Sequence, residues 1–168
     1  MTPRQISVAL VAVVLAVILQ TTLFARVRPI GVSPDIVLLT VIACARWIEP
    51  EPAVLLGFTG GLLIDLFGSA PLGLQALALT LVALAAIRTR DRYAHNFVGL
   101  GVAVGVLSFM GILLVAIIGT LFGQGTLSDP DIVKTLLLVP AFNVALGVFV
   151  LPIVAATVGD SRSAESMF

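Results

Sequence analysis

A few polar side chains interrupt the long apolar stretches of this chain, and they are the residues that could do chemistry. Asp65 lies within one apolar stretch, and Gln20, Gln75 and Asn143 lie within others. A carboxylate at the centre of a bilayer costs roughly 2.5–3.5 kcal/mol, so it needs hydrogen-bond donors, a proton or a transported ion. Amide side chains in such stretches commonly form hydrogen bonds between helices.

Residue types needed for enzyme chemistry do not form a recognisable pattern in this sequence. There is no Ser-His-Asp, Cys-His, paired-carboxylate or phosphate-loop arrangement, so we expect no catalytic activity and no cofactor. The single histidine, His95, has no partners at the spacing of zinc ligands, so we also predict no metal site. A formal net charge of zero gives nucleic acid no electrostatic attraction to the chain.

The composition predicts an all-α integral membrane protein with one domain over residues 1–168. Hydrophobic residues make up 60% of the chain and charged residues 11%, against roughly half and a quarter in a soluble domain. The apolar stretches lack the two-residue alternation of a membrane barrel. A spanning helix needs about 20 apolar residues. Polar or proline-containing breaks predict six transmembrane helices, over residues 6–24, 34–47, 53–67, 72–87, 97–122 and 132–158.

The basic residues predict the orientation, because lysine and arginine are enriched on the cytoplasmic side. With the N-terminus inside, six basic residues are cytoplasmic, namely Arg4, Arg46, Arg88, Arg90, Arg92 and Arg162. Three are then outside, namely Arg26, Arg28 and Lys134. Both termini are therefore predicted to be cytoplasmic. The run that contains Arg88, Arg90 and Arg92 could bind anionic lipid headgroups, although such runs more often only fix topology.

Three residues of the third predicted helix share one face. Gly57, Gly61 and Asp65 are spaced four apart, so we expect both glycines to face neighbouring helices inside the bundle. Asp65 lies near the outer end of this helix, just before the turn 68–71. There it could be protonated, or could accept hydrogen bonds from the amides that open the fourth helix. We predict hydrogen bonding, with proton handling as the alternative.

Polar residues of two other predicted helices have structural interpretations. The dipeptide Pro34-Asp35 is typical of a helix start, so Pro34 is placed in the first turn and Asp35 is predicted to stabilise the outer end of the second helix. Asn143 shares a face of the sixth helix with Pro140 and Gly147. It is therefore predicted to point into the bundle beside a proline kink.

Three strings carry a resemblance to a known family. They are Ser33-Pro34-Asp35-Ile36-Val37-Leu38-Leu39, Gly57-Phe58-Thr59-Gly60-Gly61-Leu62-Leu63-Ile64-Asp65-Leu66 and Ser69-Ala70-Pro71-Leu72-Gly73-Leu74-Gln75-Ala76-Leu77. Together with the length and the six predicted helices, they resemble the family of rod shape-determining protein MreD. On this ground Pro71 and Gly73 join Asp35, Gly57, Gly61, Asp65 and Asn143 as structural or partner-contact candidates.

The resemblance implies a non-enzymatic protein of the bacterial cytoplasmic membrane that supports lateral peptidoglycan synthesis and rod cell shape. It implies MreC as the direct partner, in a complex with a class B penicillin-binding protein, RodA and MreB. The family also resembles, in fold, the substrate-binding component of energy-coupling-factor vitamin transporters. Such a component is the alternative function, but it needs a polar outward pocket. The short loops 25–33 and 123–131 offer few groups to build one.

Overall fold

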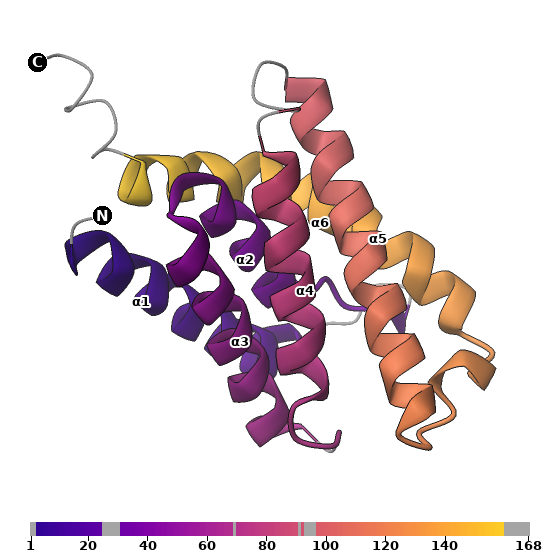
Figure 1. The fold of residues 1–168 in the computed structure, drawn as a ribbon. Coiled ribbons are helices and arrows are strands. Elements are labelled where there is room, and N and C mark those ends of the chain that lie inside the picture. Colours follow the sequence, from indigo (N-terminus) through magenta and orange to yellow (C-terminus); the bar gives the residue numbers. More distant parts are fainter. Residues whose placement is uncertain (1–2, 25–30, 69, 91, 93–96, 160–168) are drawn as a thin grey trace, which may run out of the picture.

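The computed structural model describes residues 3–24, 31–68, 70–90, 92 and 97–159, and the chain is helical, without strands, over these residues (Figure 1). The prediction of an all-α fold is confirmed. The elements in order are α1 (Pro3–Leu19), the π-helix η1 (Gln20–Phe24), α2 (Ile36–Trp47), α3 (Pro50–Phe67), α4 (Leu74–Thr89), α5 (Phe97–Leu121), the 3-10 helix η3 (Thr126–Ser128) and α6 (Ile132–Val158).

Helix length separates these helices into two groups. The four that are long and apolar enough to cross a membrane lie in α1 with η1, in α3, in α5 and in α6. The chain therefore has the helices of a membrane protein. Helices α2 and α4 are apolar but have only 12 and 16 residues. Length alone thus supports four of the six predicted spans.

Helix starts follow local chemistry, and those of α1, α2, α3 and α4 differ from the predicted ones by two or three residues. Pro34 lies before α2 and not in its first turn, because Asp35 is the N-cap residue. Helix α3 begins at Pro50, three residues earlier than predicted, with Glu49 as its N-cap. Proline is favoured at the first helical position because the amide that it lacks would have no partner there.

Helix α2 is the centre of the molecule. It contacts all five other α-helices, and nine consecutive residues from Val37 to Ala45 are buried. A helix that is apolar on every side is stable when other helices surround it completely. Protein rather than lipid therefore surrounds the shortest α-helix.

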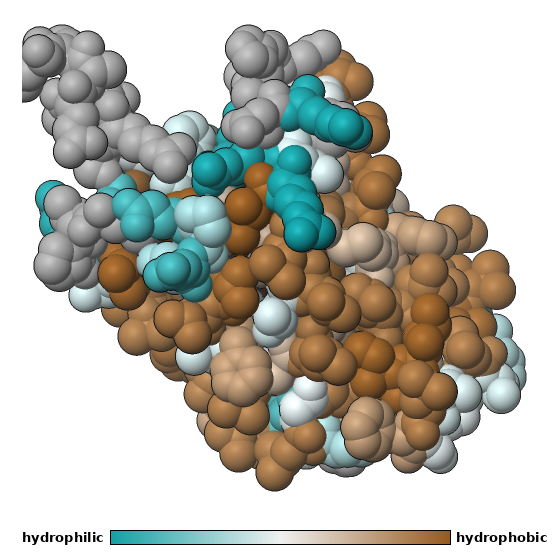
Figure 2. All heavy atoms as spheres, in the orientation of Figure 1, coloured by the Kyte–Doolittle hydropathy of each residue, from teal (hydrophilic) through white to brown (hydrophobic). Residues whose placement is uncertain are grey.

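One end of the bundle collects the basic residues, and we call it the arginine end. Here Gln5 Nε2 in α1 donates to Val158 O in α6 at 3.0 Å, and Arg90 Nη1 donates to Ile48 O at 3.2 Å. Figure 2 shows hydrophilic residues gathered at this end and hydrophobic surface over the body of the helices. The described arginines at this end are Arg4, Arg46, Arg88, Arg90 and Arg92. Arg26, Arg28 and Arg162 lie outside the described residues.

Candidate functional site

Asp65 joins the end of α3 to the start of α4. Its side chain is 3% exposed. Oδ2 accepts hydrogen bonds from Gly73 N at 2.9 Å and Ala76 N at 3.2 Å, and Oδ1 accepts one from Gln75 N at 3.1 Å. The first amides of a helix have no partner within the helix and form the positive end of its dipole. The predicted hydrogen bonding of Asp65 is therefore confirmed.

The turn before α4 directs these amides toward Asp65. Gly73 is the N-cap of α4 and has a φ of +96°, in the left-handed region where a side chain is strained. Pro71 O accepts a hydrogen bond from Leu74 N at 3.2 Å. Pro71 and Gly73 thus form the turn, and Gly73 also donates one of the bonds to the carboxylate.

Gly57 and Gly61 lie where α3 crosses α4. A Cβ at Gly61 would overlap Gln75 O and the backbone of Ala76, and a Cβ at Gly57 would lie 2.8 Å from Leu79 O. Because these neighbours are backbone atoms, a side chain would force the helices apart. The α3–α4 contact is also the most extensive between any two described helices. The prediction that both glycines face a neighbouring helix is confirmed.

A second polar cluster surrounds the start of α2. Asp35 Oδ1 accepts a hydrogen bond from Leu38 N at 3.0 Å, so Asp35 caps the helix as predicted. Gln20, the first residue of η1, accepts a hydrogen bond from Val37 N through Oε1 at 3.0 Å. The side chains of the N-cap residue and of a residue in η1 therefore satisfy amides in the first turn of α2.

Asn143 connects this cluster to α5 and α6. Its side chain is completely buried. Oδ1 accepts a hydrogen bond from Asp35 N at 3.1 Å, and Nδ2 donates to Ser108 Oγ in α5 at 3.0 Å. The inward position predicted for Asn143 is confirmed. Its two partners were not predicted, although Gly101, Gly105 and Ser108 recur on one face of α5 and mark it as a packing face.

These contacts indicate what the two carboxylates can do chemically. Asp65 and Asp35 both accept hydrogen bonds from backbone amides of a helix start, so each holds that start in place. Among the described residues, every buried side-chain nitrogen and oxygen has a hydrogen-bond partner. Within the same residues, no three histidine, cysteine or acidic side chains come together as metal ligands.

Comparisons with known proteins do not identify a family or a function for this chain. No protein-family model matches the sequence, and neither the curated proteins nor the solved structures give a significant match. The residues and their contacts therefore carry the functional argument.

Proposed function

We propose that this chain is a non-enzymatic membrane scaffold of the bacterial elongation machinery that binds MreC and supports lateral peptidoglycan synthesis. One observation carries the proposal. The three strings that resemble the MreD family contain the carboxylates of both polar clusters: the first contains the Asp35 cap of α2, and the other two contain Asp65 and the amides that it binds. The resemblance therefore involves the residues that hold the helices together.

A scaffold acts by holding a partner, and this chain offers apolar surface for that purpose. Large side chains are exposed along α1 and α6, among them Leu15, Leu137 and Phe149. Helices associate in lipid through close van der Waals packing and hydrogen bonds. In this proposal the single membrane helix of MreC packs on the apolar outer surface and contacts the short outward loops. The class B penicillin-binding protein, RodA and MreB belong to the same complex.

The proposal includes six crossings of the cytoplasmic membrane, in a bundle like that of an energy-coupling-factor substrate-binding component. Helix α2, with 12 residues, is only about 18 Å long at 1.5 Å per residue. The four residues 32–35 before it could add at most about 13 Å. Together these lengths match a hydrocarbon core of about 30 Å.

Non-helical backbone is tolerated at membrane depth only where protein encloses it and its polar groups are bonded. Val32 and Pro34 are buried, and Ser33 and Asp35 are half-buried. Asn143 and Gln20 accept hydrogen bonds from the amides of Asp35 and Val37. These contacts support a crossing in which a short helix is extended by an enclosed irregular segment.

Co-expression with tagged MreC tests the function. The full chain is expected to co-purify with MreC in mild detergent at a ratio near one to one. A different single-pass membrane protein with the same tag and expression level is the control, and it is expected to capture little of the chain.

The alternative function has its own measurement on the same purified chain. Riboflavin, thiamine and biotin are titrated separately, and no tight binding is expected. Submicromolar binding of one vitamin, together with no capture by MreC, would contradict the scaffold proposal. The chain would then be assigned as the substrate-binding component of a transporter.

A further inference from the structure

A small pocket lies at the arginine end, between α2, α4, α5 and α6. Its volume is about 30 Å³. The lining combines apolar side chains, including Ile42, Val104 and Leu107, with Arg46 and Arg90. A space with both kinds of lining suits a molecule that carries a negative group next to a hydrocarbon chain.

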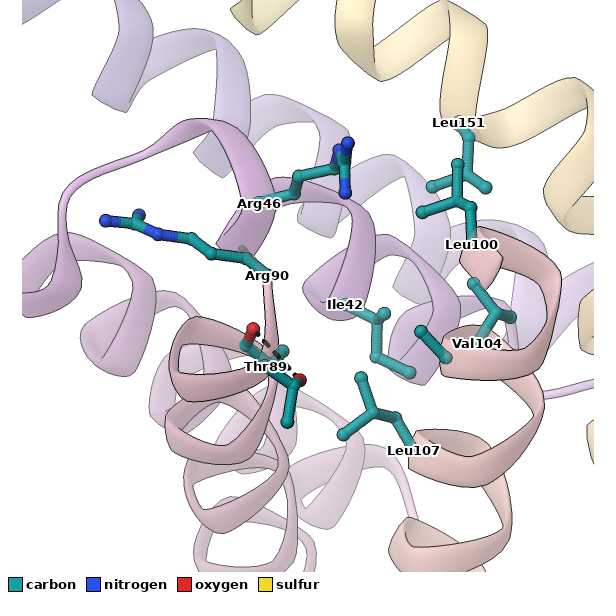
Figure 3. A pocket seen from close by; sticks show the side chains of 10 residues that line it. Ile42, Arg46, Thr89, Arg90, Leu100, Val104, Leu107 and Leu151 are labelled. Carbon is teal, nitrogen blue, oxygen red and sulfur yellow. Dashed lines mark hydrogen bonds between the residues drawn. The ribbon is translucent and has the colours of Figure 1, made fainter. Parts of the chain in front are cut away.

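The two kinds of lining residue are separated within the pocket. Figure 3 shows the side chains of Ile42, Val104 and Leu107 converging on the space, while the guanidinium groups of Arg46 and Arg90 extend away from this apolar part. The pocket therefore has an apolar interior, and the two guanidinium groups lie outside it and point in different directions.

Arg46 and Arg90 also differ from the other arginines at this end. They are half-buried, whereas Arg88 and Arg92 are exposed. Arg90 donates to Ile48 O at 3.2 Å, and Arg46 lies 5.6 Å from the centre of the Trp47 ring. In these contacts both guanidinium groups are directed away from the apolar interior, and the five N–H donors of a guanidinium can serve several acceptors at once.

We propose that this pocket binds an anionic phospholipid from the surrounding membrane. The lipid phosphate lies outside the apolar interior, and the side chains of Arg46 and Arg90 turn from the directions seen in Figure 3 to donate hydrogen bonds to it, in the planar geometry that favours guanidinium over ammonium for phosphate. Roughly one or two carbon atoms of one acyl chain fit between Ile42, Val104 and Leu107, because the space is about 30 Å³. The rest of the chain lies on the apolar surface outside. Anionic lipid attracts basic residues at the cytoplasmic surface, where the arginine end is predicted to lie.

Lipid titration of the purified full chain, followed by native mass spectrometry, tests the proposal. Dioleoylphosphatidylglycerol is expected to bind more tightly than dioleoylphosphatidylcholine, which has the same chains and no net charge. The double variant Arg46→Gln, Arg90→Gln is expected to bind the anionic lipid roughly 25-fold more weakly, at about fivefold per arginine. The matched control, Arg88→Gln with Arg92→Gln, removes the same charge and is expected to change the affinity less than threefold.

A third variant tests the apolar interior of the pocket independently of the arginine charges. Ala103→Val adds two methyl groups at the apolar interior and removes no arginine, so it is expected to weaken binding of the anionic lipid about fourfold, the free energy of about one buried methylene. Retained melting temperature in each variant shows that folding is intact, and Ala103→Val serves if the arginine double variant unfolds.

Three results would overturn the lipid site. Equal affinity of the wild-type chain for the two lipids would exclude recognition of the negative charge. An equal loss in both arginine double variants would indicate diffuse surface attraction instead of a site. Full displacement of the lipid by 10 mM inorganic phosphate would show that Arg46 and Arg90 bind a free anion instead of a lipid.

Discussion

At the scale of single residues, Asp65 holds the α3–α4 hairpin together because its carboxylate supplies acceptors to three amides. Gly73, Gln75 and Ala76 each donate one hydrogen bond to it. A helix-starting amide that loses its acceptor in a buried site loses the full hydrogen-bond energy and regains no water. The residue is therefore a structural acceptor, and its replacement should damage folding before anything else.

We expect Asp65→Ala to lower the free energy of unfolding by several kcal/mol, since each unsatisfied buried donor costs roughly 1–3 kcal/mol. Asp65→Asn keeps one oxygen acceptor and should lose less. Thermal unfolding in detergent measures the loss of stability, and co-purification with MreC measures whether each variant still binds its proposed partner. If both variants fold and bind MreC normally yet fail equally to support cell elongation, Asp65 has a proton-handling role instead.

Asp35 provides a second test at this scale. Loss of an N-cap side chain costs roughly 0.5–2 kcal/mol, and asparagine is nearly as good a cap as aspartate. Asp35→Ala should therefore lower the unfolding free energy by about 1 kcal/mol, and Asp35→Asn should change it little. Asp35→Arg reverses the charge at the positive end of α2 and should be the least stable. An unchanged melting temperature for Asp35→Arg would show that the cap contributes nothing.

At the scale of helices, the spacing of residues along the chain was enough to predict which residues share a helix face. It was a poor guide to which helix that face contacts. Four-residue spacing was enough to place Gly57, Gly61 and Asp65 on one face, and the short turn after Phe67 left α4 as the nearest partner. The central place of α2 could not be predicted, because a helix that is apolar on every side has no periodic pattern to indicate direction.

The second polar cluster shows the same limit. Gln20, Ser108 and Asn143 could each be identified as a polar residue on an apolar helix. Their contacts join segments far apart in the chain, so the partner of each depends on how the whole bundle packs. The π-helical turn that begins at Gln20 likewise carries no signal in local spacing.

The α3–α4 crossing makes a testable prediction about glycine. Gly61→Ala places a Cβ against the backbone of α4 and should destabilise the protein by roughly 1–3 kcal/mol, as overpacking does in other cores. Gly101→Ala in α5 is the matched control, because its Cβ would lie 3.8 Å from Val144 Cγ1, an ordinary contact. It should leave stability unchanged or raise it slightly through better helix propensity. Equal melting temperatures for the two variants would show that α3 and α4 do not approach each other closely at Gly61.

At the scale of the whole molecule, the two ends of the bundle differ in the helix ends that meet there and in their charge. The start of α1, the ends of α2 and α4 and the end of α6 meet at the arginine end. The turn before α4 and the connection from α5 to α6 lie at the other ends of their helices. Lys134 in α6 is paired with Asp131 at 3.0 Å, so it adds little net positive charge there. The distribution favours a cytoplasmic arginine end.

Single cysteines placed between consecutive helices test this orientation and the short crossings together. Four exposed positions serve, namely Glu49, Leu72, Arg92 and Ser128. With six crossings, cysteines at Leu72 and Ser128 should react with an impermeant maleimide in intact cells. Those at Glu49 and Arg92 should react only after permeabilisation. The native Cys44 is completely buried, so the wild-type chain provides the unlabelled control.

Two consecutive cysteine positions are separated by one helix, so a comparison of their reactivity shows whether that helix crosses the membrane. Positions 72 and 92 differ only by α4, so equal reactivity in intact cells would show that its 16 residues do not cross the membrane. Positions 92 and 128 test α5 in the same way. With α1 crossing from a cytoplasmic start, reaction of a cysteine at Glu49 in intact cells would show that α2 turns back inside the bundle. A fully inverted pattern would place the arginine end outside and contradict the predicted orientation.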